Sequence, residues 1–133
     1  MATQDLTVGG SAQPYNGHSP VSVVPFEYDA TVNAAASGDD LKLLALPVGA
    51  LVLGVDITIS SAEGTDTADF GFAAAGTTIA SSTTITAGTI QFATPTYIGT
   101  TTGGIWMHTD AAFSTCVLTG KVAVVYANLD PQP

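Results

Sequence analysis

The sequence predicts an all-β protein, an antiparallel β-sandwich of jelly-roll type with about eight short strands. Short stretches in which apolar and polar residues alternate recur along the chain, as expected for strands with one buried face. Glycine, proline and small polar residues separate these stretches, and no segment shows the period of an amphipathic helix. At 133 residues, the chain fits one domain.

Residues 1–20 differ in composition from the rest of the chain. They are rich in Gly, Ser, Gln, Asn and Pro and show no period, so we expect an extended N-terminal arm that orders when it docks. A frayed chain end would have the same composition. No basic segment followed by an apolar core opens the chain, which argues against a secretory signal. We expect the single β-sandwich domain over residues 21–130.

The strands of this domain can be placed by their alternation. The first begins at Val21, and Pro25 puts it at a sheet edge or a bend, because proline cannot donate to a strand ladder. The last lies within residues 116–129, where one face carries Leu118, Val122, Val124 and Tyr126 with Gly120 between them. Between these two, strands are expected around residues 69–74, 77–80, 88–94 and 105–110.

Residues 44–59 form the longest apolar stretch. Pro47, Gly49 and Gly54 interrupt it, and its uncharged run is shorter than the roughly 20 residues of a membrane-spanning helix, so we reject a membrane segment. We expect a hairpin of strands 41–46 and 50–60, with a tight turn at residues 47–49. The predicted inner face of the second strand is Leu51, Leu53, Val55, Ile57 and Ile59.

The chain carries a net charge of −9, from 11 acidic residues against 2 basic ones. Proteins hold nucleic-acid phosphates largely through Lys and Arg, so we exclude nucleic acid and, on the same ground, an anionic membrane surface as partners. Only 10% of the residues are charged, whereas soluble domains average about 25%. We infer that much of the surface is buried against other subunits; the alternative is a monomer with a neutral surface.

No set of residues indicates an enzyme. His108 and Asp110 are close in sequence, but alternate strand positions share a face without catalysis, and no GxSxG motif is present. The one cysteine, Cys116, begins an apolar strand, so we expect it in the core. Two histidines, His18 and His108, are too few for a zinc site of three or four protein ligands. We therefore expect no catalytic residues and no cofactor.

Acidic residues gather in two short segments. Glu63, Asp66 and Asp69 form one group, and Asp39 and Asp40 form the other. Oxygen-rich loops can bind Ca²⁺, but the EF-hand pattern is missing. We expect solvated acidic loops and leave a Ca²⁺ site as the alternative.

Three aromatic residues, Tyr97, Trp106 and Tyr126, could form a sugar-binding platform, yet Tyr and Trp also mark protein interfaces. No strong polar group accompanies them, so core or interface positions are the better interpretation. We expect His108 beside Trp106 on the surface face of its strand. The residues predicted at an interface are Tyr15, Pro20, Tyr97 and Trp106.

Three segments, "LALPVGALVLGVDITISS" (44–61), "TDTADFGFAAAG" (65–76) and "KVAVVYANL" (121–129), resemble small bacteriophage virion proteins. The resemblance lies in the pattern of an apolar hairpin and Thr-, Ala- and Gly-rich strands on a short acidic chain. It implies a capsid decoration (cement) protein, jelly-roll in type. Such a protein would bind the major capsid protein as a homotrimer, between neighbouring capsomers on the outer surface of the virion. The resemblance brings no catalytic residue with it.

Charge agrees with an outer position. The interior of a DNA-filled head is strongly anionic and would repel a subunit of charge −9. A trimer with extended arms would multiply weak contacts across capsomers through avidity. The alternative is a tail- or fibre-associated protein or a carbohydrate-binding β-sandwich.

Overall fold

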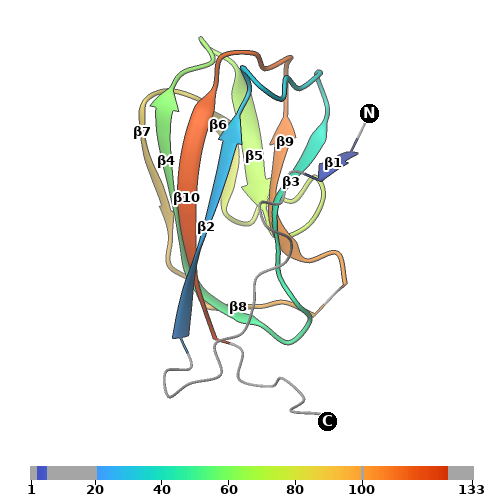
Figure 1. Ribbon diagram of the computed structural model, residues 1–133, viewed down its shortest axis with the longest axis vertical. Helices are drawn as coiled ribbons and strands as arrows, with labels where there is room; N and C mark the ends of the chain where they lie inside the picture. Colours follow the sequence, from blue (N-terminus) through green and yellow to red (C-terminus); the bar gives the residue numbers. More distant parts are fainter. Residues whose placement is uncertain (1–2, 6–20, 100, 126–133) are drawn as a thin grey trace.

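Two β-sheets pack face to face in the computed structural model, which describes residues 3–5, 21–99 and 101–125 (Figure 1). Sheet A has the strand order β1-β3-β9-β5-β6, and sheet B has the order β2-β10-β4-β7 with β8 beside β4. No helix in the described residues is long and apolar enough to cross a membrane. The strands are β1 (Thr3–Asp5), β2 (Val21–Asp29), β3 (Asp40–Ala45), β4 (Leu51–Ser61), β5 (Thr67–Gly71), β6 (Ala80–Thr84), β7 (Gly88–Phe92), β8 (Thr96–Tyr97), β9 (Gly104–Thr109) and β10 (Val117–Val125).

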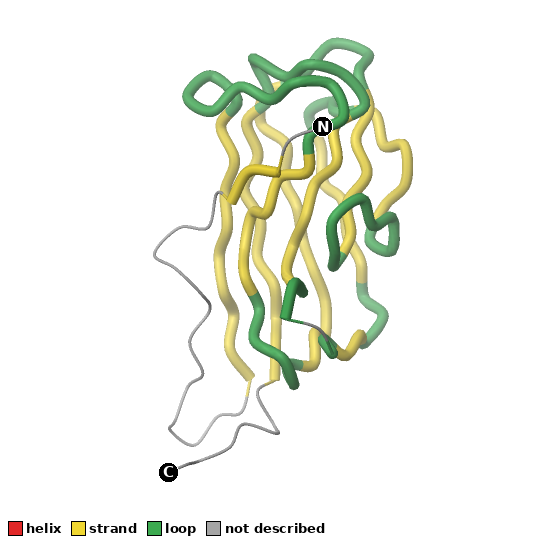
Figure 2. Tube along the Cα trace, turned by 90° about the vertical axis from the view of Figure 1, so that its right-hand side faces the viewer, coloured by secondary structure: helices red, strands yellow, loops and turns green. Residues whose placement is uncertain are grey.

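The order of the strands is that of a jelly roll. When the short strands β1 and β8 are set aside, two four-stranded sheets remain, and the chain repeatedly crosses from one to the other. All described strand pairs are antiparallel except β1 with β3. Most connecting loops lie at the two ends of the sandwich, and one lies beside the strands at mid-height (Figure 2). The predicted all-β sandwich is therefore confirmed.

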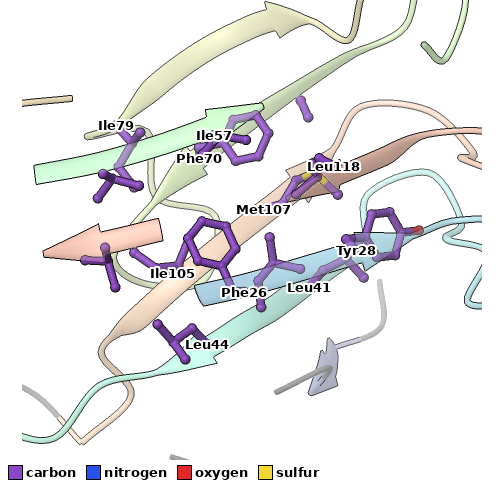
Figure 3. Close-up of a cluster of buried hydrophobic side chains, with 14 of the residues drawn as sticks. Phe26, Tyr28, Leu41, Leu44, Ile57, Phe70, Ile79, Ile105, Met107 and Leu118 are labelled. Carbon is purple, nitrogen blue, oxygen red and sulfur yellow. The ribbon is translucent and has the colours of Figure 1, made fainter. Parts of the chain in front are cut away.

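Apolar side chains from the facing sides of the two sheets fill the space between them (Figure 3). The core includes Leu41, Phe70 and Ile105 from sheet A and Phe26 and Ile57 from sheet B, each at most 3% exposed. Burial of apolar surface stabilises the fold by about 25 cal/mol per Å². The alternation of apolar residues along each strand thus decides which face turns inward.

The apolar stretch 44–59 contributes to two strands, as predicted, but these strands do not pair. β3 lies in sheet A and β4 in sheet B, so the predicted hairpin is wrong. The turn between them carries the chain from one sheet to the other. In this turn Gly49 adopts a φ of 97°, which glycine tolerates, and the Ala50 N–H donates to the Pro47 carbonyl at 3.2 Å. Both strands are strongly apolar because each faces the core and has neighbouring strands on both sides.

The first half of β4 turns a different face inward from the one predicted. Residues 55–59 alternate as expected, but Val52 is buried where the sequence places Leu51 and Leu53 in the core. Successive residues of β10 pair with Gly54 and with Val52, which leaves Leu53 as an extra residue in a β-bulge. One inserted residue moves the alternation to the opposite face.

The other strands follow the predicted order with small shifts. Pro25 lies on β2, which forms an edge of sheet B as predicted. The strand expected at 69–74 ends at Gly71, and the strand expected at 77–80 is β6, which begins only at Ala80. The inward face of β10 is confirmed for Leu118, Gly120, Val122 and Val124, and Tyr126 lies outside the described residues.

Part of the expected N-terminal arm forms a strand. Residues Thr3–Asp5 make β1, which pairs in parallel with β3 at the edge of sheet A. The side-chain amide of Gln4 also donates to the Asp39 carboxylate at 3.2 Å. The rest of residues 1–20 lies outside the described part of the chain, as do residues 126–133.

Strands β2 and β10 approach each other closely at Gly120. Phe26 pairs with Gly120, and the Phe26 ring lies directly against the glycine. A Cβ atom on Gly120 would lie 2.2 Å from this ring and 2.8 Å from the backbone oxygen of Asp56 on β4. The position therefore accepts no side chain unless the sheet shifts.

We predict that Gly120→Ala lowers the free energy of unfolding by about 1–3 kcal/mol, the usual cost of overpacking a core. Urea denaturation followed by tryptophan fluorescence measures this change. Thr119→Ala, which alters the exposed neighbour, is the control and should change the free energy by less than about 0.5 kcal/mol. Equal stability of Gly120→Ala and the native chain would contradict the close approach of β2 and β10.

Candidate interaction surface

Part of the outer face of sheet A is covered by the middle of the segment between β5 and β6, around Ala75 and Gly76. The Ala75 N–H donates to the Asp40 carboxylate at 3.0 Å, and the Gly104 N–H donates to the Phe72 carbonyl at 3.1 Å. Gly71 and Gly76 lie so close that a Cβ on Gly71 would be 2.5 Å from a backbone atom of Gly76. The side chains beneath this segment are therefore withdrawn from solvent.

Trp106 is one of these withdrawn side chains, at 6% exposed. Its indole N–H donates to the Thr102 carbonyl at 2.9 Å, and the Lys42 ammonium lies 5.8 Å from the ring centroid in a cation–π contact. The ring thus offers little surface to a sugar or a partner. Tyr97, by contrast, is 61% exposed on β8.

The remaining residues predicted at an interface, Tyr15 and Pro20, lie outside the described residues, as does Tyr126. The structure therefore assembles no aromatic platform from the described residues. Trp106 and Tyr97 differ in exposure, and only Tyr97 presents its side chain openly to solvent.

His108 is paired with Asp40 rather than with Asp110. Its Nδ1 lies 2.7 Å from an Asp40 carboxylate oxygen, whereas the Asp110 carboxylate accepts a hydrogen bond from the Thr67 hydroxyl. The same Asp40 oxygen accepts the Ala75 N–H, so the pair joins β3, β9 and the covering segment. No hydroxyl or thiol of the described residues is hydrogen-bonded to His108, and the pair acts as a structural brace.

The prediction of solvated acidic loops is wrong for three residues. Asp39, Asp40 and Glu63 are only 3%, 4% and 8% exposed. Asp39 accepts the Ala36 N–H at 2.9 Å and thereby closes the turn before β3. No group of three or more His, Cys, Asp or Glu side chains that could hold a metal ion occurs among the described residues.

Glu63 joins two loops at one end of the sandwich. Its carboxylate accepts hydrogen bonds from the N–H groups of Ser114, Thr115 and Cys116 at 2.9, 2.7 and 2.6 Å, and from the Thr115 hydroxyl at 3.1 Å. Burial alone would raise the pKa of this carboxyl, but the hydrogen bonds to its charged form outweigh burial and lower the pKa below its ordinary value. The ionised form of Glu63 is thus part of the folded structure.

Cys116 is fully buried, as predicted. Burial, together with the nearby negative charges of Glu63 and Asp29, raises the pKa of the Cys116 thiol to about 12. The thiol therefore stays protonated and is unsuited to nucleophilic chemistry.

The outer face of sheet B is open in the part of the chain that the structure describes, and we call it the sheet B face (Figure 1). It carries Val23, Pro25 and Glu27 of β2, Thr119, Lys121 and Ala123 of β10, and Gly54, Asp56 and Thr58 of β4. Two shallow depressions of about 340 and 440 Å³ lie on this face, and Asp56 and Lys121 line both. The face is thus the best candidate for a contact surface on the subunit.

The charged side chains of the sheet B face have no hydrogen-bond or ion-pair partner among the described residues. Glu27, Asp56 and Lys121 are exposed, and their side chains make no hydrogen bond or ion pair with any described residue. Lys121 stands opposite Asp56 in the ladder without forming an ion pair. Other carboxylates are held by the chain itself, as at Asp69, which accepts the Ser82 N–H at 2.6 Å; Asp66, outside the sheet B face, is an exception.

None of these three residues was predicted from the sequence as a site residue. Alternation does place Glu27, Asp56 and Lys121 on the outer face of their strands, because each lies between buried neighbours. Strand order, however, cannot be obtained from alternation, and only the pairing of β10 with both β2 and β4 brings the three together.

Solved structures share this fold. A chain of the structure described as "Capsid of Ralstonia phage GP4" matches with a TM-score of 0.69 and 15% identity, over 94% of this chain and 99% of that chain. A chain of "Cyanophage Pam1 capsid asymmetric unit" matches with a TM-score of 0.58 and 18% identity, over 86% of this chain and 93% of that chain. No protein-family model and no curated protein sequence matches the chain. At these identities the likeness establishes the fold.

We predict that Glu63→Gln lowers the free energy of unfolding at neutral pH by about 1.5–3 kcal/mol, because an amide NH₂ would face backbone N–H groups that now donate to a carboxylate. Urea denaturation measures the loss. Asp66→Asn, which changes a carboxylate that accepts no hydrogen bond from a described residue, is the control and should be nearly neutral.

The stability of the native chain should also depend on pH through Glu63. Because the pKa of Glu63 is lower in the folded state, the unfolded chain binds more protons, and stability falls as pH drops from the ordinary glutamate pKa through the folded one. Glu63→Gln should lose less stability over this acidic range. An identical pH dependence for the variant and the native chain would contradict the role of Glu63.

Proposed function

We propose that this chain is a non-enzymatic structural component of a bacteriophage capsid. The observation that carries this proposal is the match in fold to a chain of the GP4 capsid over nearly the whole of both chains. A second chain from a phage capsid, that of Pam1, has the same fold. A likeness over the whole chain supports a shared role better than a likeness confined to one part.

Within this role, we propose a decoration (cement) protein that binds the major capsid protein as a homotrimer on the outer surface of the head, between neighbouring capsomers. The net charge of −9 supports the outer position, because packaged DNA would repel the subunit from the interior. The open sheet B face and the exposed Tyr97 provide surface for contacts with other subunits. Tyr15, Pro20 and Trp106 stay predictions as interface residues.

The described residues support a structural role in a second way. The groups that could carry chemistry are engaged in the fold: His108 with Asp40, and Glu63 with three backbone N–H groups. Cys116 is buried and protonated. A carbohydrate-binding module or a tail- or fibre-associated protein is the alternative, and the burial of Trp106 weakens its sugar-binding form.

The first test of this proposal is co-sedimentation of the purified chain with phage heads assembled without it. We expect the chain to pellet with the heads and to raise the temperature at which they release DNA. A chain that stays in the supernatant over a wide range of salt concentrations would contradict the capsid role.

Light scattering of the purified chain tests the trimer separately. We expect a mass close to three times the 13.3 kDa of the chain, because the neutral surface favours burial against other subunits. A monomer that still binds heads would contradict the trimer but would agree with the capsid role.

A further inference from the structure

The smaller depression of the sheet B face brings apolar and charged residues together. Pro25, Thr58 and Thr119 are among the residues that line it, and they lie on the outward side of β2, β4 and β10. Glu27 of β2 and Asp56 of β4 line it as well, with Lys121 of β10 beside them. The hollow lies over the central strand β10, between the outward side chains of its two neighbours β2 and β4.

The carboxylates around this hollow differ from the buried carboxylates of the subunit. Buried carboxylates such as Asp39 and Glu63 are held by backbone N–H groups of the chain itself. Glu27 and Asp56 are held by no described residue, and they lie on two strands that flank the same hollow. Two unpaired carboxylates against one ammonium give the hollow a negative balance, which the net charge of −9 reinforces.

We propose that this hollow receives a basic side chain, arginine or lysine, from the capsid protein that the subunit binds; this inference rests on the proposed function. The aliphatic stem of such a side chain would pack against Pro25. Its charged end would reach the carboxylates of Glu27 and Asp56, and a guanidinium could bind either one through two parallel hydrogen bonds.

A second copy of this chain is a poor occupant. The sequence has no arginine, and its two lysines are Lys42 and Lys121. Lys42 lies over the Trp106 ring, and Lys121 belongs to the face itself. The basic side chain must therefore come from a different protein, which makes the sheet B face the side turned toward the capsid.

Three single substitutions that each remove one negative charge test the proposal on heads assembled without the chain. Glu27→Gln and Asp56→Asn should each weaken binding by about fivefold at low salt, and each should flatten the dependence of binding on salt. Asp66→Asn, which makes the same change in net charge away from the sheet B face, is the matched control and should bind like the native chain. Lys121→Gln should strengthen binding, because it removes a competing cation.

Two results with heads would overturn the docking proposal while the capsid role stands. One is native-like binding of Glu27→Gln and Asp56→Asn. The other is equal weakening by Asp66→Asn, which would indicate a general effect of charge. Thermal unfolding of each variant checks that these exposed substitutions leave the fold intact.

A second measurement tests the hollow without heads. N-acetyl-arginine amide is titrated into the isotope-labelled chain, and N-acetyl-citrulline amide serves as the neutral control. We expect arginine-specific shifts of the amide signals of Phe26, Gly120 and Lys121, and the loss of these shifts in Glu27→Gln/Asp56→Asn. Absent shifts, or equal shifts with citrulline, would overturn the proposal. If native chain fails to bind heads but shows the arginine-specific shifts, the capsid role fails and the basic-side-chain site stands.

Discussion

The chain has eleven acidic residues and only two basic ones, so most carboxylates cannot pair with a lysine or arginine. In the folded protein, buried carboxylates accept hydrogen bonds from backbone N–H groups in place of ion pairs with basic side chains. Glu63 holds the loop before β10, and Asp40 holds the segment over sheet A together with His108. A buried carboxylate without such donors would cost several kcal/mol. These hydrogen bonds therefore hold the loop before β10 and the segment over sheet A, whereas Glu27 and Asp56 stay on the surface without a partner among the described residues.

Alternation along the chain was sufficient to predict the fold class and most strands. It correctly gave the inward face of β10, because burial of one face is a local property of each strand. The edge position of Pro25 followed instead from the missing N–H of proline. It failed at β4, where a bulge at Leu53 exchanges the two faces. A bulge is fixed by the pairing with β10, some 70 residues further along the chain, and no local pattern shows it. The hairpin failed for the same reason, since apolar strands joined by a short turn can equally lie in one sheet or in two.

The site residues were harder to predict than the fold. The role of Glu63 depends on N–H groups more than 50 residues away, which no acidic motif reveals. Tryptophan is common at protein interfaces, yet Trp106 is buried under the segment over sheet A, and the Lys42 ammonium lies over its ring. Glu27, Asp56 and Lys121 meet only because β10 lies between β2 and β4. A jelly roll brings together distant strands, so its surface sites are properties of topology rather than of sequence motifs.

In our proposal, this small acidic sandwich holds its own loops with its buried carboxylates and presents its sheet B face to a basic partner. The most direct test is electron cryo-microscopy of phage heads incubated with the purified chain. The account predicts added density on the outside of the heads, shaped like the two-sheet domain, with the sheet B face toward the capsid. Heads without added density, or density with the sheet B face turned to solvent, would contradict it.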